Sequence, residues 1–156
     1  MTKELSRRQM LVGLGVVAAG AAGLPVGLEA QTTITVYKDA NCGCCQKWVD
    51  HMKANGFAAS VTNSTDMPAI KARHKVGSAL QSCHTSIVGG YVIEGHVPAS
   101  DVRTLLTRKP TGIIGLTIPG MPPSAPGMDL TPFQPYTVLS FDAQGKTTVF
   151  AQHDKA

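Results

Sequence analysis

The chain has 156 residues, of which 43% are hydrophobic and only 15% are charged, a composition expected of one small globular domain. So low a charge content excludes a charge-driven disordered chain and a long coiled coil. The formal net charge is +4, but no run of Lys or Arg exceeds two residues, and aromatic residues make up only 5%. We therefore expect no nucleic-acid partner, because both a phosphate-binding patch and a base-stacking platform are missing.

Residues 1–30 have the pattern of an export signal. Arg7 and Arg8 precede an apolar run at 10–28, which spans 19 positions without a charged residue. The arginine pair is typical of a twin-arginine signal, which predicts export to the periplasm. The run is long enough to span a membrane, but its glycines and Pro25 weaken it as a helix. We therefore expect membrane contact only through an uncleaved signal, followed by a single domain at 31–156.

The next part of the chain predicts alternating strands and helices. In chain order we expect a strand at 34–37, a helix from 42–44 to 55, a strand at 57–62, a helix from 66 to about 75, a hairpin of 86–88 and 91–94, and a helix at 98–108. Asn41 and Asp66 are the expected N-caps of the first two helices. This order is that of a thioredoxin-like α/β fold, βαβ followed by αββα, with the first two strands parallel.

Two further segments extend this expected core. Residues 111–135 are rich in Gly and Pro and predict a long ordered loop. Residues 137–141 and 146–151 flank a turn and predict a terminal β-hairpin. The expected fold is therefore a thioredoxin-like core with an added Pro/Gly/Met loop and a C-terminal β-hairpin.

The cysteines carry the clearest chemical signal. Cys42 and Cys45 have C-x-x-C spacing between a strand and a helix, where the helix N-terminus lowers a thiol pKa. Cys44 adds a third thiol to the same turn, which is more than dithiol exchange needs. Three convergent sulfurs suit Cu(I) or Zn(II). Cys83 lies in the loop before the expected third strand, and in thioredoxin-like folds that loop faces the C-x-x-C turn.

Two other interpretations of the cysteines stay open. Exported proteins with an even number of cysteines commonly form disulfides. A bridge between Cys44 and Cys45 would be strained, so any such pairing should use Cys42 or Cys83. A zinc site is the other interpretation, and it is disfavoured because adjacent cysteines rarely both reach one ion.

Methionines and histidines extend the candidate site. Met121 and Met128 lie in the Pro/Gly loop, and their thioethers would suit Cu(I) if the loop folds over the cysteine turn. Ordinary packing by flexible side chains is an equal alternative. His84 follows Cys83 and is a candidate metal ligand or a partner of one. The other histidines are weaker candidates or expected surface residues: His96, and then His51, His74 and His153.

Together these motifs resemble the CopG-type copper-resistance proteins, formerly known only as a domain of unknown function. The resemblance rests on Asn41-Cys42-Gly43-Cys44-Cys45, Ser82-Cys83-His84-Thr85, Glu94-Gly95-His96-Val97-Pro98 and the loop at 119–129, and it covers residues 34–151. It implies a thioredoxin-like periplasmic protein that binds copper through Cys42, Cys44, Cys45 and Cys83. It extends less securely to Met121 and Met128.

The resemblance also sets expectations about activity. Members of this family are proposed to hold a multicopper thiolate cluster and to interconvert Cu(I) and Cu(II). Copper is then the expected cofactor, and periplasmic copper-handling or electron-donor proteins are the expected partners. The alternative function is a thiol–disulfide oxidoreductase that uses Cys42 and Cys45. The sequence leaves open whether the protein is an enzyme.

Overall fold

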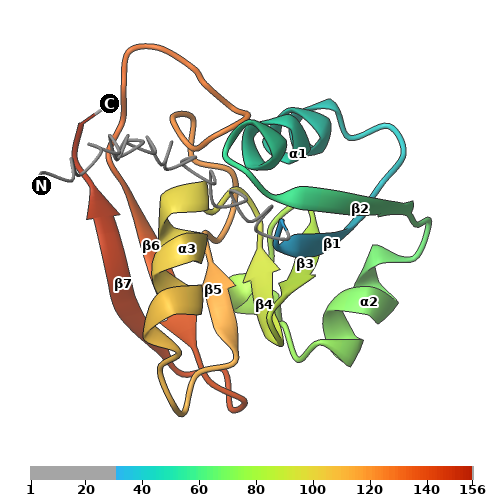
Figure 1. Cartoon of the computed structure of the whole chain (residues 1–156), viewed down its shortest axis with the longest axis vertical. Helices are drawn as coiled ribbons and strands as arrows, with labels where there is room; N and C mark the ends of the chain where they lie inside the picture. Colours follow the sequence, from blue (N-terminus) through green and yellow to red (C-terminus); the bar gives the residue numbers. More distant parts are fainter. Residues whose placement is uncertain (1–30, 156) are drawn as a thin grey trace, which may run out of the picture.

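The computed structural model describes residues 31–155, which form a mixed α/β fold around one seven-stranded sheet (Figure 1). In chain order the elements are β1 (Thr33–Lys38), α1 (Gly43–Ala54), β2 (Ala58–Asn63), α2 (Met67–Arg73), a 3-10 turn η1 (Ser78–Leu80), β3 (Thr85–Val88), β4 (Tyr91–Glu94), α3 (Ala99–Arg108), β5 (Gly115–Thr117), β6 (Tyr136–Phe141) and β7 (Thr147–His153). The export signal predicted at 1–30 lies outside the described residues. Within 31–155, no helix combines the length and apolarity that crossing a membrane requires.

The strands and helices predicted for the core are present. β1 and β2 pair in parallel, as predicted for a strand–helix–strand unit. β3 pairs antiparallel with both β1 and β4. The β3–β4 turn is Gly89-Gly90, and both glycines have the positive φ that a tight hairpin turn needs. β6 and β7 form the predicted C-terminal hairpin.

The prediction of one continuous loop at 111–135 is wrong, because this segment contains β5. β5 pairs parallel with β4 and antiparallel with β6, and so joins the core and the C-terminal hairpin into one sheet, β2-β1-β3-β4-β5-β6-β7. The strand has only three residues and begins with a glycine, which gives little sequence signal. Gly115 is required there, because a Cβ would overlap the Val92 carbonyl and the Phe141 ring.

The central strands of the sheet are buried on both faces, whereas the outer strands β2 and β7 are partly exposed. One face packs against α1 and α3 through Ile34, Val36, Ile93, Trp48, Met52, Val102 and Leu105. On the other face, Val76 and Leu80 from the segment after α2 pack against Val92 and Phe141. Because Val92 and Ile93 are consecutive in β4, they point to opposite faces, and the domain has helical layers on both sides of the sheet.

The starts of the first two helices differ in how they are capped. α2 begins as predicted at Asp66, whose carboxylate accepts a hydrogen bond from the Ala69 N–H at 3.0 Å. The prediction of Asn41 as the cap of α1 is wrong. Asp39 Oδ1 accepts the Asn41 N–H at 2.7 Å, and the N-cap is Cys42, whose side chain makes no capping bond. The first turn of α1 thus contains cysteines and no acidic residue.

The loop between β5 and β6 folds over the first turn of α1. Gly127 lies so close that a Cβ there would be 2.8 Å from Trp48 N and 3.0 Å from Cys44 O. At the other end of the loop, Gly120 N donates to Gln81 O at 3.2 Å. The loop therefore reaches from the segment before β3 to α1. The methionine hypothesis required this loop to fold over the cysteine turn.

We expect Gly127→Ala to lower the free energy of unfolding by about 2–4 kcal/mol, because a methyl group would meet helix backbone that cannot move aside. Gly120→Ala is the matched control, since it has a similar positive φ, +71°, but open space around the added carbon. It should cost only about 1 kcal/mol. Urea unfolding of both variants measures the difference, and equal losses would contradict the seating of this loop on α1.

Candidate metal centre

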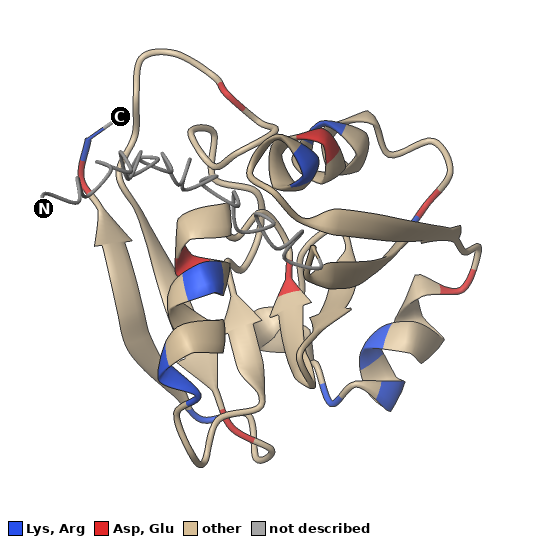
Figure 2. Cartoon of the chain, viewed as in Figure 1, with Lys and Arg blue, Asp and Glu red and all other residues tan. Residues whose placement is uncertain are grey.

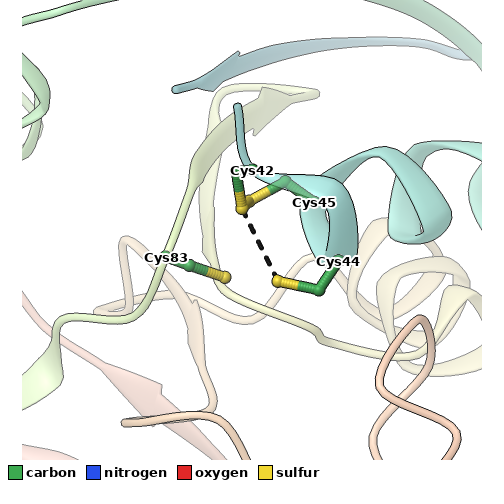
Figure 3. A group of neighbouring side chains, drawn as sticks. All are labelled: Cys42, Cys44, Cys45 and Cys83. Atoms are coloured by element: carbon green, nitrogen blue, oxygen red, sulfur yellow. Dashed lines mark hydrogen bonds between the residues drawn. A yellow bond between two sulfur atoms is a disulfide. The ribbon is translucent and has the colours of Figure 1, made fainter. Parts of the chain in front are cut away.

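Four sulfur atoms meet at the N-terminus of α1 (Figure 3). Cys42, Cys44 and Cys45 come from the start of the helix, and Cys83 comes from the loop before β3. Their Sγ atoms all lie within 4.8 Å of one another. The structure therefore brings together all four cysteines that the sequence predicted would converge.

Two of the four sulfurs are covalently paired. Cys42 and Cys45 form a disulfide, while Cys44 and Cys83 are free thiols. The Cys42 and Cys44 Sγ atoms are 3.5 Å apart. The bond joins the C-x-x-C pair and includes Cys42, as the disulfide interpretation required. This form of the chain offers two free thiols, and the disulfide must be reduced before all four sulfurs are available as ligands.

A second group of donors shares Cys83. The donor atoms of Cys83, His84 and His96 also lie within 4.8 Å of one another. Cys83 Sγ is 2.9 Å from His96 Nε2 and 3.6 Å from His84 Nδ1. Both imidazoles are fully buried. Cys83 is thus the point at which the sulfur cluster and the pair of imidazoles meet.

The structure places His96, a weaker candidate in the sequence analysis, in contact with Cys83. Its Nδ1 lies 2.7 Å from the Pro126 carbonyl oxygen, which can only accept, so Nδ1 carries the hydrogen. Burial lowers the His96 pKa and keeps the ring neutral, which leaves a lone pair on Nε2 directed at Cys83. A histidine that donates one N–H to a carbonyl and offers the other nitrogen is the usual arrangement of a metal ligand. The motif around His96 was visible in the sequence, but its contact with Pro126, 30 residues further along the chain, was not.

His84 lies beneath Cys83 and packs on Trp48, with ring centroids 4.4 Å apart. Burial lowers the His84 pKa well below its ordinary value, and the charges of His96, Lys71 and Lys38 lower it further. Its Nε2 is buried and has no hydrogen-bond partner among residues 31–155. An unpaired buried nitrogen is costly, so it marks a position where a ligand or a water would be stabilising.

Burial raises the pKa of the Cys83 thiol to about 12, and the neighbouring Cys44 contributes in the same direction. Cys83 is therefore protonated at neutral pH in the metal-free chain. A cation bound by this sulfur would have to displace the proton, so metal affinity should increase with pH.

A buried carboxylate holds the loop that carries Cys83. Glu94, at the end of β4, accepts hydrogen bonds from Ser82 N and Thr85 Oγ1, both at 2.7 Å, and from Lys71 Nζ at 2.5 Å. In Figure 2 most charged residues lie on helices and loops. Glu94 is one of only two Lys, Arg, Asp or Glu residues within the strands. Burial raises the Glu94 pKa, and Lys71 opposes that shift. This buried pair holds the backbone of Ser82 and the side chain of Thr85, which lie on either side of Cys83 and His84.

The two methionines lie in the loop at 119–130, each next to a glycine that contacts another element. Met128 is half-buried and follows Gly127, which lies against Trp48 and Cys44. Met121 is 53% exposed and follows Gly120, whose backbone bonds to Gln81. Among the described residues, neither methionine belongs to the buried core clusters.

Two histidines expected at the surface have structural partners instead. His51 is half-buried, and its Nε2 accepts the Ala99 N–H at the start of α3 at 3.2 Å. His153 Nε2 lies 2.8 Å from Asp101 Oδ2, which ties β7 to α3. The expectation of solvated side chains fails because each ring meets a helix that is distant in sequence.

We expect Glu94→Gln to lower the free energy of unfolding by about 3–5 kcal/mol, because it leaves the Lys71 ammonium buried without a counter-charge. The matched control is the double variant Lys71→Met/Glu94→Gln, which removes the stranded charge while keeping an oxygen for Ser82 N. It should recover most of the loss in denaturant unfolding. A double variant as unstable as the single one would contradict the assignment of the cost to the unpaired charge.

The comparisons with known proteins agree with this geometry. A family model described as "Protein of unknown function, DUF411" matches residues 80–128, the segment that contains Cys83, both buried imidazoles and both loop methionines. Two solved structures described as copper resistance protein CopG, forms 1 and 2, match at 38% and 39% identity. They cover 81% and 80% of this chain and 100% and 99% of their own, with TM-scores of 0.75 and 0.74. Among curated proteins there is no match. At this identity and coverage, the chain belongs to the CopG family of copper resistance proteins.

Proposed function

We propose that the protein is a periplasmic copper-binding protein that contributes to copper resistance. The observation that carries this proposal is the convergence of four cysteine sulfurs within 4.8 Å at one helix N-terminus, beside two buried imidazoles. The proposed ligand set is Cys42, Cys44, Cys45 and Cys83, with His84, His96, Met121 and Met128 as further donors.

The chemistry of these donors fits copper better than zinc. Thiolate and thioether sulfur are soft ligands that favour Cu(I), and imidazole suits both oxidation states of copper. Structural zinc sites use four ligands arranged as a tetrahedron. Here Cys44 and Cys45 are adjacent, and Cys83 belongs to two donor groups at once. A sulfur shared by two groups supports a site with more than one copper ion.

Redox activity is the finer part of the proposal. A mixed set of sulfur and imidazole donors supports binding of both Cu(I) and Cu(II), so the centre is suited to their interconversion. Such a reaction needs an electron partner, and we propose periplasmic copper-handling or electron-donor proteins for this role. Copper bound at the centre would supply the one-electron chemistry, and the chain holds the sulfurs and imidazoles in place.

The architecture supports a thioredoxin-like arrangement of the core. The sheet order β2-β1-β3-β4 and a C-x-x-C turn at the start of α1 are its expected features. We further propose that residues 1–30 direct the chain to the periplasm through the twin-arginine route, on the basis of Arg7, Arg8 and the apolar run after them.

A thiol–disulfide oxidoreductase is the second candidate, because one observation favours it. The Cys42–Cys45 disulfide lies at a helix N-terminus, with Cys42 partly exposed and Cys45 fully buried. An accessible sulfur paired with a buried one is suited to exchange with a substrate disulfide.

We expect the reduced, metal-free protein to bind more than one Cu(I) per chain, and we expect Cys44→Ser and Cys83→Ser each to lose at least one equivalent. Both changes remove a sulfur from the shared cluster. Anaerobic competition against a chromophoric Cu(I) chelator measures this stoichiometry. Met121→Leu and Met128→Leu should weaken affinity without removing an equivalent, and Met67→Leu in α2 is the matched thioether control.

Two results would contradict the copper proposal. One is full Cu(I) stoichiometry in both cysteine variants. The other is a protein that binds no copper but catalyses the reduction of a substrate disulfide with Cys44 and both loop methionines dispensable, which would favour the oxidoreductase.

A further inference from the structure

The sulfur cluster contains a disulfide and two free thiols in one contact group. Cys44 Sγ is 3.5 Å from Cys42 Sγ, and Cys83 Sγ lies within 4.8 Å of the other three sulfurs. In Figure 3 the Cys44 and Cys83 side chains point toward one another, below the Cys42–Cys45 bond. The copper proposal uses these sulfurs as ligands and gives no role to their reactions with each other.

We propose that Cys44 and Cys83 form a second redox pair, and that the disulfide moves between Cys42–Cys45 and Cys44–Cys83 by thiol–disulfide exchange within the chain. In the first step the Cys44 sulfur attacks Cys42 Sγ, a Cys42–Cys44 bond forms, and Cys45 leaves as a thiolate. In the second step the Cys83 sulfur gives its proton to His96 Nε2, which lies 2.9 Å away, and attacks Cys44 Sγ; the Cys44–Cys83 bond forms, and Cys42 leaves as a thiolate.

The exchange is balanced without an outside reagent. One disulfide and two thiols are present before and after it, and the protons of Cys44 and Cys83, the latter by way of His96, pass through solvent to Cys42 and Cys45. No oxidant or reductant is consumed. A second disulfide, giving the four-electron oxidised chain, requires an added disulfide oxidant such as oxidised glutathione.

The two elements that carry this pair are held close together. Cys44 lies in the first turn of α1, which is covered by the loop at Gly127. Cys83 is fixed on one side by Glu94, which binds Ser82 N, and on the other by the bond from Gly95 N to His84 O at 2.9 Å. Groups held side by side react as if at a very high concentration, which favours a bond between these elements.

The four cysteines differ in how far solvent and small reagents can reach them. Cys45 is fully buried, whereas Cys42, Cys44 and Cys83 are partly exposed. The exchange would convert a bond within one helix turn into a link between α1 and the segment before β3. The chain with both disulfides would have no thiolate left, so oxidation would reversibly close the cluster to metal ions.

This inference concerns the metal-free chain and is independent of the proposed copper function. Trypsin cleaves after Lys38, Lys47, Lys75 and Arg103, so peptide 39–47 contains three of the cysteines and peptide 76–103 contains Cys83. The Cys42–Cys45 disulfide leaves these peptides separate, and the Cys44–Cys83 disulfide joins them. Metal-free protein carrying one disulfide is incubated, quenched with acid and alkylated, and its peptides are identified by mass spectrometry.

We expect the joined peptides to increase with time while the number of thiols stays at two per chain. In Cys44→Ser they should fall several-fold. The double variant Cys42→Ser/Cys45→Ser should form the joined pair within single chains in a glutathione buffer. Wild-type protein that never yields the joined peptides would overturn the proposal even if a variant misfolds. Undiminished joining in Cys44→Ser would overturn it as well, because Cys83 would then pair with another cysteine.

Discussion

A buried carboxylate at the end of β4 determines where Cys83 lies. Glu94 receives the N–H of Ser82, the hydroxyl of Thr85 and the ammonium of Lys71, and it is fully buried. These bonds hold Ser82 by its backbone and Thr85 by its side chain, and these two residues flank Cys83 and His84. A charged group at this depth is stable only when its partners are complete, so the loop has little freedom to move away from α1.

The candidate centre is formed by four separate parts of the chain. The start of α1 supplies three cysteines, and the segment before β3 supplies Cys83 and His84. The segment after β4 supplies His96. The fourth part is the loop at 119–130, in which the carbonyl of Pro126 sets the His96 tautomer. Trp48 links two of these parts to α1: its Nε1 donates to Val97 O at 2.9 Å in the segment after β4, and its ring packs on His84 in the segment before β3. The free thiols of Cys44 and Cys83 and the neutral imidazoles are therefore held in place in the metal-free chain, which would lower the cost of binding an ion.

The sequence predicted the local features of this arrangement better than the long-range ones. The strands, helices, hairpins and the Asp66 cap follow from periodicity and turn residues, and the convergence of the four cysteines follows from the element order. β5 was missed because a three-residue strand beginning with Gly115 depends on its neighbours in the sheet. The Lys71–Glu94 pair was missed, and His96 was only a weaker candidate, because their partners are distant in sequence. A single charge in an apolar strand, as in Tyr-Val-Ile-Glu, is the one local signal that pointed to the buried pair.

Copper X-ray absorption of the reduced, copper-loaded protein tests the central claim most directly, because it reports the atoms around the metal. The account predicts a first shell dominated by sulfur, with nitrogen as a minor component and a second metal at short distance. A first shell of nitrogen and oxygen alone, with all four thiols still open to alkylation, would contradict it.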